Sequence, residues 1–98
     1  MRPISLHLND GAARPWFLWN EDLSVDEFRA RLHGEDAAER DRLLALLLRE
    51  ANDAEVWQFV SPQQVADALP RLQRRLGVRR APFWNFLIER WRRDGYVV

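Results

Sequence analysis

Helix signals are densest in residues 24–51, which read SVDEFRARLHGEDAAERDRLLALLLREA. Ser24 and Glu27 have the spacing of a capping box, in which each side chain accepts a hydrogen bond from the other residue's backbone N–H. The apolar residues that follow, Val25, Phe28 and Leu32, share one helix face, and Gly34 is a typical helix terminator. The pattern therefore predicts a first helix that begins after Ser24 and ends near Gly34.

A longer helix is expected from Asp36 to about Ala51, because Asp36 and Glu39 repeat the capping pattern. At 100° per residue, five apolar side chains form a stripe about 140° wide. These are Leu43, Leu44, Leu47, Leu48 and Ala51. Leu46 falls outside the stripe, so it either faces outward as a contact residue or is covered by a second layer of the same small domain.

Three further helical segments are predicted after this helix. Asp53 is expected to cap a short one, and Ser61-Pro62-Gln63-Gln64 is a third capping pattern with proline at the favoured first position. Pro70 lies inside the apolar spacing that follows, which predicts a kink or break near Leu69. Gly77 should end that segment, and Pro82 should begin a last helix that ends near residue 93.

Residues 1–22 lack helical periodicity. Ile4, Leu6 and Leu8 alternate with polar residues as in a short strand. The aromatic run 16–19 is expected to pack on the helices, because it would otherwise leave a large apolar patch exposed. We therefore predict an all-α fold, a small single-domain bundle of about five helical segments (23–98) with a non-helical aromatic N-terminal arm (1–22).

The composition excludes several classes of protein. Apolar residues make up 47% of the 98 residues and charged residues 31%, which is typical of a globular chain. The chain has no Cys, and therefore neither disulfides nor thiolate metal sites. Its longest apolar run, 43–48, is far shorter than the roughly 18 residues of a membrane span. We expect a bacterial, cytoplasmic protein without membrane association.

The formal net charge of zero conceals an asymmetry. Residues 1–56 carry twelve acidic side chains and seven Arg, a net charge of −5, whereas residues 57–98 carry three acidic side chains and eight Arg, a net charge of +5. Such a chain can neutralise itself on folding, form a head-to-tail homodimer, or present its basic end to an acidic partner.

Catalytic chemistry is not indicated by the residues available. His7 and His33 lie far apart in the sequence, and two of the three serines, Ser24 and Ser61, are assigned to helix caps. The acidic clusters near helix starts are typical of capping rather than of metal binding. We predict no enzymatic activity, no cofactor and no metal site.

Two kinds of binding remain open. Trp and Arg are enriched at interface hot spots, and the best candidates to contact a protein partner are Trp16, Trp19, Phe86, Arg90 and Arg93. The alternative is a small helix-turn-helix-like DNA-binding regulator, in which arginines would contact phosphates. The candidates for that role are Arg71, Arg74, Arg75, Arg79 and Arg80.

One resemblance bears on the choice. The aromatic element 15–22, the segment Val56-Trp57-Gln58-Phe59-Val60 and the pair Phe83-Trp84 with Leu87 and Trp91 occur in this order. Over residues 15–93 the chain resembles small bacterial proteins encoded beside nucleotidyltransferase-type toxins of the abortive-infection class. The resemblance implies an antitoxin or accessory partner that binds the toxin, and it supplies no catalytic residues.

Overall fold

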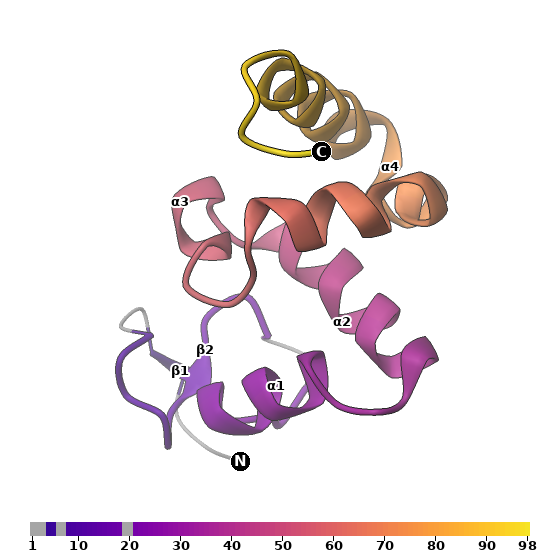
Figure 1. Cartoon of the computed structure of the whole chain (residues 1–98). Helices are drawn as coiled ribbons and strands as arrows, with labels where there is room; N and C mark the ends of the chain where they lie inside the picture. The colour runs from indigo at the N-terminus through magenta and orange to yellow at the C-terminus, as the bar shows by residue number, and fades with distance from the viewer. Residues whose placement is uncertain (1–3, 6–7, 19–20) are drawn as a thin grey trace. The chain divides into compact units, whose positions relative to one another are not determined.

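A computed structural model of the chain describes residues 4–5, 8–18 and 21–98 (Figure 1). Helices make up well over half of these residues, which confirms the expected helical class. The chain divides into two compact units, residues 1–44 and residues 45–98. The predicted division between an arm and a helical domain after residue 22 stays a prediction.

In the first unit, strand β1 (Ile4–Ser5) pairs in parallel with strand β2 (Arg14–Pro15). Strand β2 was not expected, because no alternating pattern marks it. Helix α1 (Val25–Leu32) begins with the predicted capping box. The Glu27 N–H donates to Ser24 Oγ at 3.1 Å, and the Ser24 N–H donates to Glu27 Oε1 at 3.2 Å.

The segment before α1 packs on the start of that helix. The Val25 N–H donates to the Ala13 carbonyl at 2.8 Å, and the Asp26 N–H donates to the Gly11 carbonyl at 3.1 Å. These bonds satisfy N–H groups of the first helical turn, which have no partner within the helix. Phe17 is buried and meets Phe28 edge-on, with ring centroids 5.5 Å apart.

Helix α2 (Ala37–Glu50) begins where predicted, with the Glu39 N–H bonded to Asp36 Oδ1 at 3.1 Å. All six residues from Leu43 to Leu48 are buried. Six successive residues cover every side of a helix, so this part of α2 is enclosed rather than amphipathic. Leu46 is therefore covered within the fold, which is the second of the two alternatives, and it is not an outward contact residue.

The second unit contains helices α3 (Asp53–Val56) and α4 (Pro62–Arg93). The cap of α3 is Asn52 rather than Asp53, and the Asn52 N–H donates to Glu55 Oε1 at 3.1 Å. Ser61 caps α4 as predicted, because its hydroxyl accepts from the Gln64 N–H at 3.2 Å. None of the helices in the described ranges is long and apolar enough to cross a membrane.

Helix α4 is interrupted at Gly77, which divides it into a first segment (62–76) and a second segment (78–93). Gly77 has φ 78° and ψ 178°, a conformation almost restricted to glycine. Pro70 keeps helical dihedral angles, so the expected break near Leu69 does not occur; its ring is exposed rather than wedged into the core. The second segment begins at residue 78, one turn before the predicted Pro82.

Candidate protein-binding surface on helix α4

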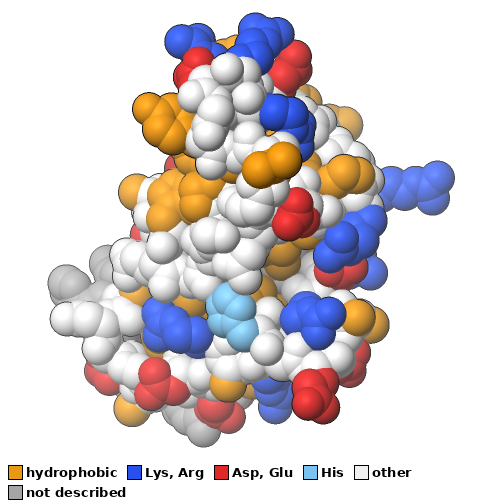
Figure 2. All heavy atoms as spheres, in the orientation of Figure 1, with side chains coloured by type: hydrophobic (Ala, Val, Ile, Leu, Met, Phe, Trp, Pro, Cys, Tyr) orange, Lys and Arg blue, Asp and Glu red, His pale blue; other side chains and the backbone are white. Residues whose placement is uncertain are grey.

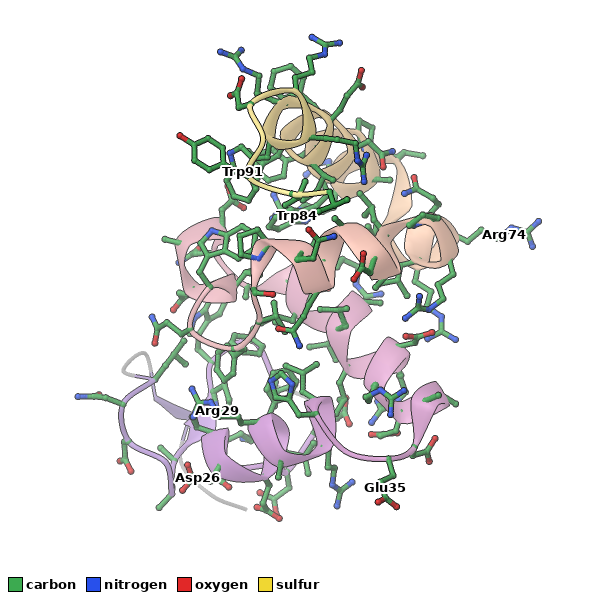
Figure 3. The ribbon with its side chains drawn as sticks, in the orientation of Figure 1. Asp26, Arg29, Glu35, Arg74, Trp84 and Trp91 are labelled. Atoms are coloured by element: carbon green, nitrogen blue, oxygen red, sulfur yellow. The ribbon has the colours of Figure 1, made fainter. Side chains whose placement is uncertain are left out.

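The second segment of α4 is oriented by its buried face. Trp84 is fully buried, and its indole N–H donates to the Leu48 carbonyl at 2.8 Å. Leu48 lies in the last turn of α2, where carbonyl groups have no partner within the helix. Trp57 meets Trp84 edge-on at 5.7 Å and Trp91 at 5.2 Å between ring centroids. Trp84 and Trp91 point from this segment toward the first segment (Figure 3).

Arg80 also binds the Leu48 carbonyl that accepts from Trp84. Its Nε donates to the Leu48 carbonyl at 3.1 Å, and its Nη2 lies 2.6 Å from Asp53 Oδ1. The guanidinium also lies over the ring of Phe83, 4.8 Å from the centroid. These interactions hold Arg80 within the unit, where it is half-buried, and its predicted phosphate contact stays a prediction.

The opposite face of the segment carries three of the predicted partner-binding residues. At 100° per residue, Arg79, Phe86, Arg90 and Arg93 fall within an arc of about 60°. We call these four residues the outer face of α4. Phe86 is 69% exposed although its neighbours Trp84 and Ile88 are buried. Charged and hydrophobic side chains gather over this end of α4, at the top of the view in Figure 2.

Local ion pairs hold Arg90 and Arg93 of the outer face in place. Arg93 Nη2 lies 2.9 Å from Glu89 Oε1, and Arg90 Nε lies 3.3 Å from Asp94 Oδ2. Phe86, Glu89, Arg90 and Arg93 together line a small depression of about 70 Å³. Exposed pairs at this spacing contribute only about 0.3–0.5 kcal/mol, so a partner's carboxylates can replace them at little cost.

The two remaining predicted contact residues lie in the first unit. Trp16 is half-buried and meets Phe17 edge-on, with centroids 5.8 Å apart. This packing is intramolecular, as is usual for an aromatic side chain next to a core. Trp19 lies outside the described residues.

The other arginines of the predicted phosphate-binding set lie near the bend of α4. Arg71, Arg74, Arg75 and Arg79 are all exposed. Arg71 Nη1 donates to the Asp67 carbonyl at 3.2 Å. Figure 3 shows Arg74 extended away from the ribbon at the bend. Four of the five residues are therefore exposed, whereas Arg80 is half-buried and paired with Asp53.

Sequence reasoning missed a depression of the second unit that has a volume of about 600 Å³. It is lined mainly by the segment 57–64 and by Trp91. The signal that could have found it is the high aromatic content of 57–59 and 91.

The described serines and histidine that carry reactive groups take the following positions. Ser24 and Ser61 accept hydrogen bonds as helix caps, and His33 is exposed at the end of α1. In the described part of the chain, no three His, Asp or Glu side chains are grouped so that they could hold a metal ion. The arrangement on α4 is instead suited to binding, because it presents an aromatic ring among cations.

No family model matches the chain, and neither the curated proteins nor the solved structures contain a match to it.

Proposed function

We propose that this chain is a non-enzymatic protein-binding module that contacts its partner through the outer face of α4. The observation that carries the proposal is the exposure of Phe86, 69%, between arginines on a helix whose opposite face is buried. Burying a Phe side chain contributes roughly 1.5–3 kcal/mol, which the isolated chain forgoes at this position.

The residue types fit an interface hot spot. Hot spots combine an aromatic or Arg anchor with surrounding contacts that exclude water. Arg90 and Arg93 present planar guanidinium groups that can bind a carboxylate through two hydrogen bonds. We therefore propose a partner surface with an apolar pocket for Phe86 and carboxylates beside it.

The first partner to test is the one that the resemblance of residues 15–93 implies, a nucleotidyltransferase-type toxin encoded by a neighbouring gene. The chain would then be its antitoxin or accessory partner. This identification depends on the order of aromatic residues in the sequence and on no structural observation.

Co-expression with the product of the neighbouring gene, followed by pull-down, tests the proposal. We expect Phe86→Ala to weaken binding by about 2 kcal/mol or more, roughly thirtyfold, and Arg93→Ala to weaken it by about 1 kcal/mol. Tyr96→Ala, another exposed aromatic residue, and Arg31→Ala, an exposed Arg of α1, are the matched controls. Equal binding by Phe86→Ala and Tyr96→Ala would rule out the proposed surface.

The second candidate function is a DNA-binding regulator, favoured by the exposed arginines 71, 74, 75 and 79. Tight binding to the protein's own promoter should then weaken steeply as salt rises. We favour protein binding because the second segment of α4 offers Phe86 outward and buries Trp84, whereas helices that read DNA place Arg, Asn or Gln against the bases. Salt-dependent promoter binding without co-purification of a partner would reverse this preference.

A further inference from the structure

The bend of α4 carries a concentration of uncompensated positive charge. Residues 68–88 include five Arg and neither Asp nor Glu. Arg80 is paired with Asp53, and three of the other cations, Arg74, Arg75 and Arg79, are exposed around Gly77. Within the described ranges, no ion pair joins Arg74, Arg75 or Arg79 to a carboxylate. A surface of this kind attracts acidic groups.

The same bend is hollowed and partly apolar. A depression of about 510 Å³ is lined by Val78, Ala81 and Pro82, by Arg74, and by Gln73 and Asn85. Val78 is 93% exposed, so its isopropyl group is available to a ligand. Apolar side chains and arginines are thus only a few positions apart in the sequence at this bend.

The depression is also fixed in shape. Gln73 and Asn85, one from each segment of α4, exchange two side-chain hydrogen bonds of 2.8 Å across the bend. Gln73 Nε2 also donates to the Leu69 carbonyl at 3.0 Å. Together with the conformation of Gly77, these bonds set the angle between the segments before any ligand arrives, which lowers the entropic cost of binding.

We propose that the bend of α4 is a docking surface for an acidic peptide segment of another protein, made of Asp or Glu residues around one apolar side chain. The apolar side chain would lie against Val78, Ala81 and Pro82, and the flanking carboxylates would bind Arg74 and its neighbours Arg75 and Arg79. This surface shares Arg79 with the outer face but does not include Phe86, Arg90 or Arg93, so it adds a second contact region to the proposed function.

Charge alone would equally suit a nucleic acid, but the lining of the depression favours a peptide. Sites for single-stranded nucleic acid combine arginines with aromatic rings on which bases stack. The depression is lined by aliphatic side chains and an amide pair, with no aromatic ring among its described lining residues.

Fluorescence anisotropy with a labelled peptide of Glu residues around one central Leu tests this assignment. A twin peptide with Gln in place of every Glu, and a single-stranded oligonucleotide of equal charge, are the competing probes. We expect the Glu peptide to bind, more weakly as salt rises, and Arg74→Glu or Val78→Gln to reduce its affinity about tenfold. Arg90→Glu, which makes the same charge change on the outer face, should have little effect.

Several results would overturn the assignment. These are equal binding of the Gln peptide, tighter binding of the oligonucleotide, an equal loss with Arg90→Glu, or no binding at all. Self-association of the chain that competes with the peptide and is lost in Arg74→Glu would assign the surface to a second copy instead. Circular dichroism checks the fold of each variant, and Arg75→Gln, which lies outside the outer face, replaces any that unfolds. Because Phe86→Ala should leave peptide binding unchanged, failure here is distinguishable from failure of the outer face.

Discussion

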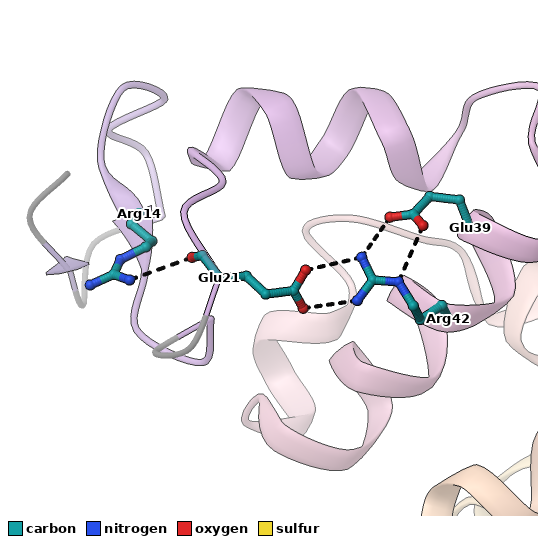
Figure 4. Close-up of polar contacts among 4 residues, drawn as sticks. All are labelled: Arg14, Glu21, Glu39 and Arg42. Carbon is teal, nitrogen blue, oxygen red and sulfur yellow. Dashed lines mark hydrogen bonds and ion pairs between the residues drawn. The ribbon is translucent and has the colours of Figure 1, made fainter. Parts of the chain in front are cut away.

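Among single residues, Arg42 of α2 shows how an arginine can join separate parts of one unit. Its guanidinium binds both carboxylate oxygens of Glu21 at 3.0 Å and both of Glu39, at 2.6 and 3.2 Å (Figure 4). The hydrogen bond from Arg42 lowers the pKa of Glu39 below its ordinary value of 4.5. The two carboxylates in turn raise the pKa of Arg42, so it stays charged.

This cluster predicts a stability that depends on pH. Because the pKa of Glu39 is lowered by folding, its contribution is fully present above pH 4.5 and is lost as pH falls through the lowered value. Glu39→Gln should therefore be less stable than the wild type at neutral pH, by about 0.5 kcal/mol because the pair is exposed, and equally stable in strong acid. Thermal unfolding over this pH range measures the difference. Glu35→Gln, outside the cluster, should show no such convergence.

Residue identity predicted the local caps but not the environment of each side chain. Ser24, Asp36 and Ser61 cap helices as expected, because a cap depends on residues only three positions apart. The burial of Leu46 and the ion pair of Arg80 could not be predicted in the same way, because burial and ion pairing depend on segments distant in sequence. The partner of Arg80, Asp53, lies 27 residues away, and no periodicity indicates it.

At the scale of elements, the two segments of α4 show that one glycine can interrupt a helix that two prolines leave continuous. Pro70 and Pro82 each remove one N–H donor, and the helix continues through both. Gly77 instead adopts a backbone conformation that other residues avoid, which turns the chain. The sequence predicted a helix end at Gly77 but also a kink or break near Pro70, because an internal proline loses one backbone hydrogen bond and its ring crowds the preceding turn.

Gly77→Ala should therefore destabilise the protein by about 1–3 kcal/mol through backbone strain. A clash is not the cause, because an added Cβ at this position would meet no atom within 4 Å. Urea unfolding measures the change. Gly34→Ala is the matched control, since its Cβ would make ordinary contacts at 3.4 Å and its φ is not positive, and it should change stability by less than about 0.5 kcal/mol. If the Gly77→Ala variant were as stable as the Gly34→Ala variant, residue 77 would impose no backbone strain on alanine.

For the whole molecule, helical class and charge asymmetry were the properties that composition and periodicity could predict. Residues 1–44 carry nine acidic side chains and six Arg, and residues 45–98 carry six and nine, so the units have net charges of −3 and +3. The candidate surfaces on α4 needed three-dimensional information. Phe86 was a contact candidate from the sequence, but its exposure is known only from the structure. The depression at the bend depends on the dihedral angles of Gly77.

The division of the chain passes through α2, which spans Ala37–Glu50 without interruption. If either unit unfolded alone, the half of α2 left behind would be about seven residues long, and helices shorter than about 12 residues are marginal in water. We therefore expect both units to unfold in one cooperative transition, as most small chains do.

Urea unfolding of a variant with Trp16→Phe and Trp19→Phe tests this expectation. Its remaining tryptophans, at positions 57, 84 and 91, all lie in the second unit, whereas far-ultraviolet circular dichroism reports helices of both units. The fluorescence and dichroism midpoints should coincide, provided that the variant retains the wild-type dichroism midpoint. A fluorescence transition displaced from the dichroism transition would mean that α2 does not couple the units and that the α4 surfaces belong to an independently folding part of the chain.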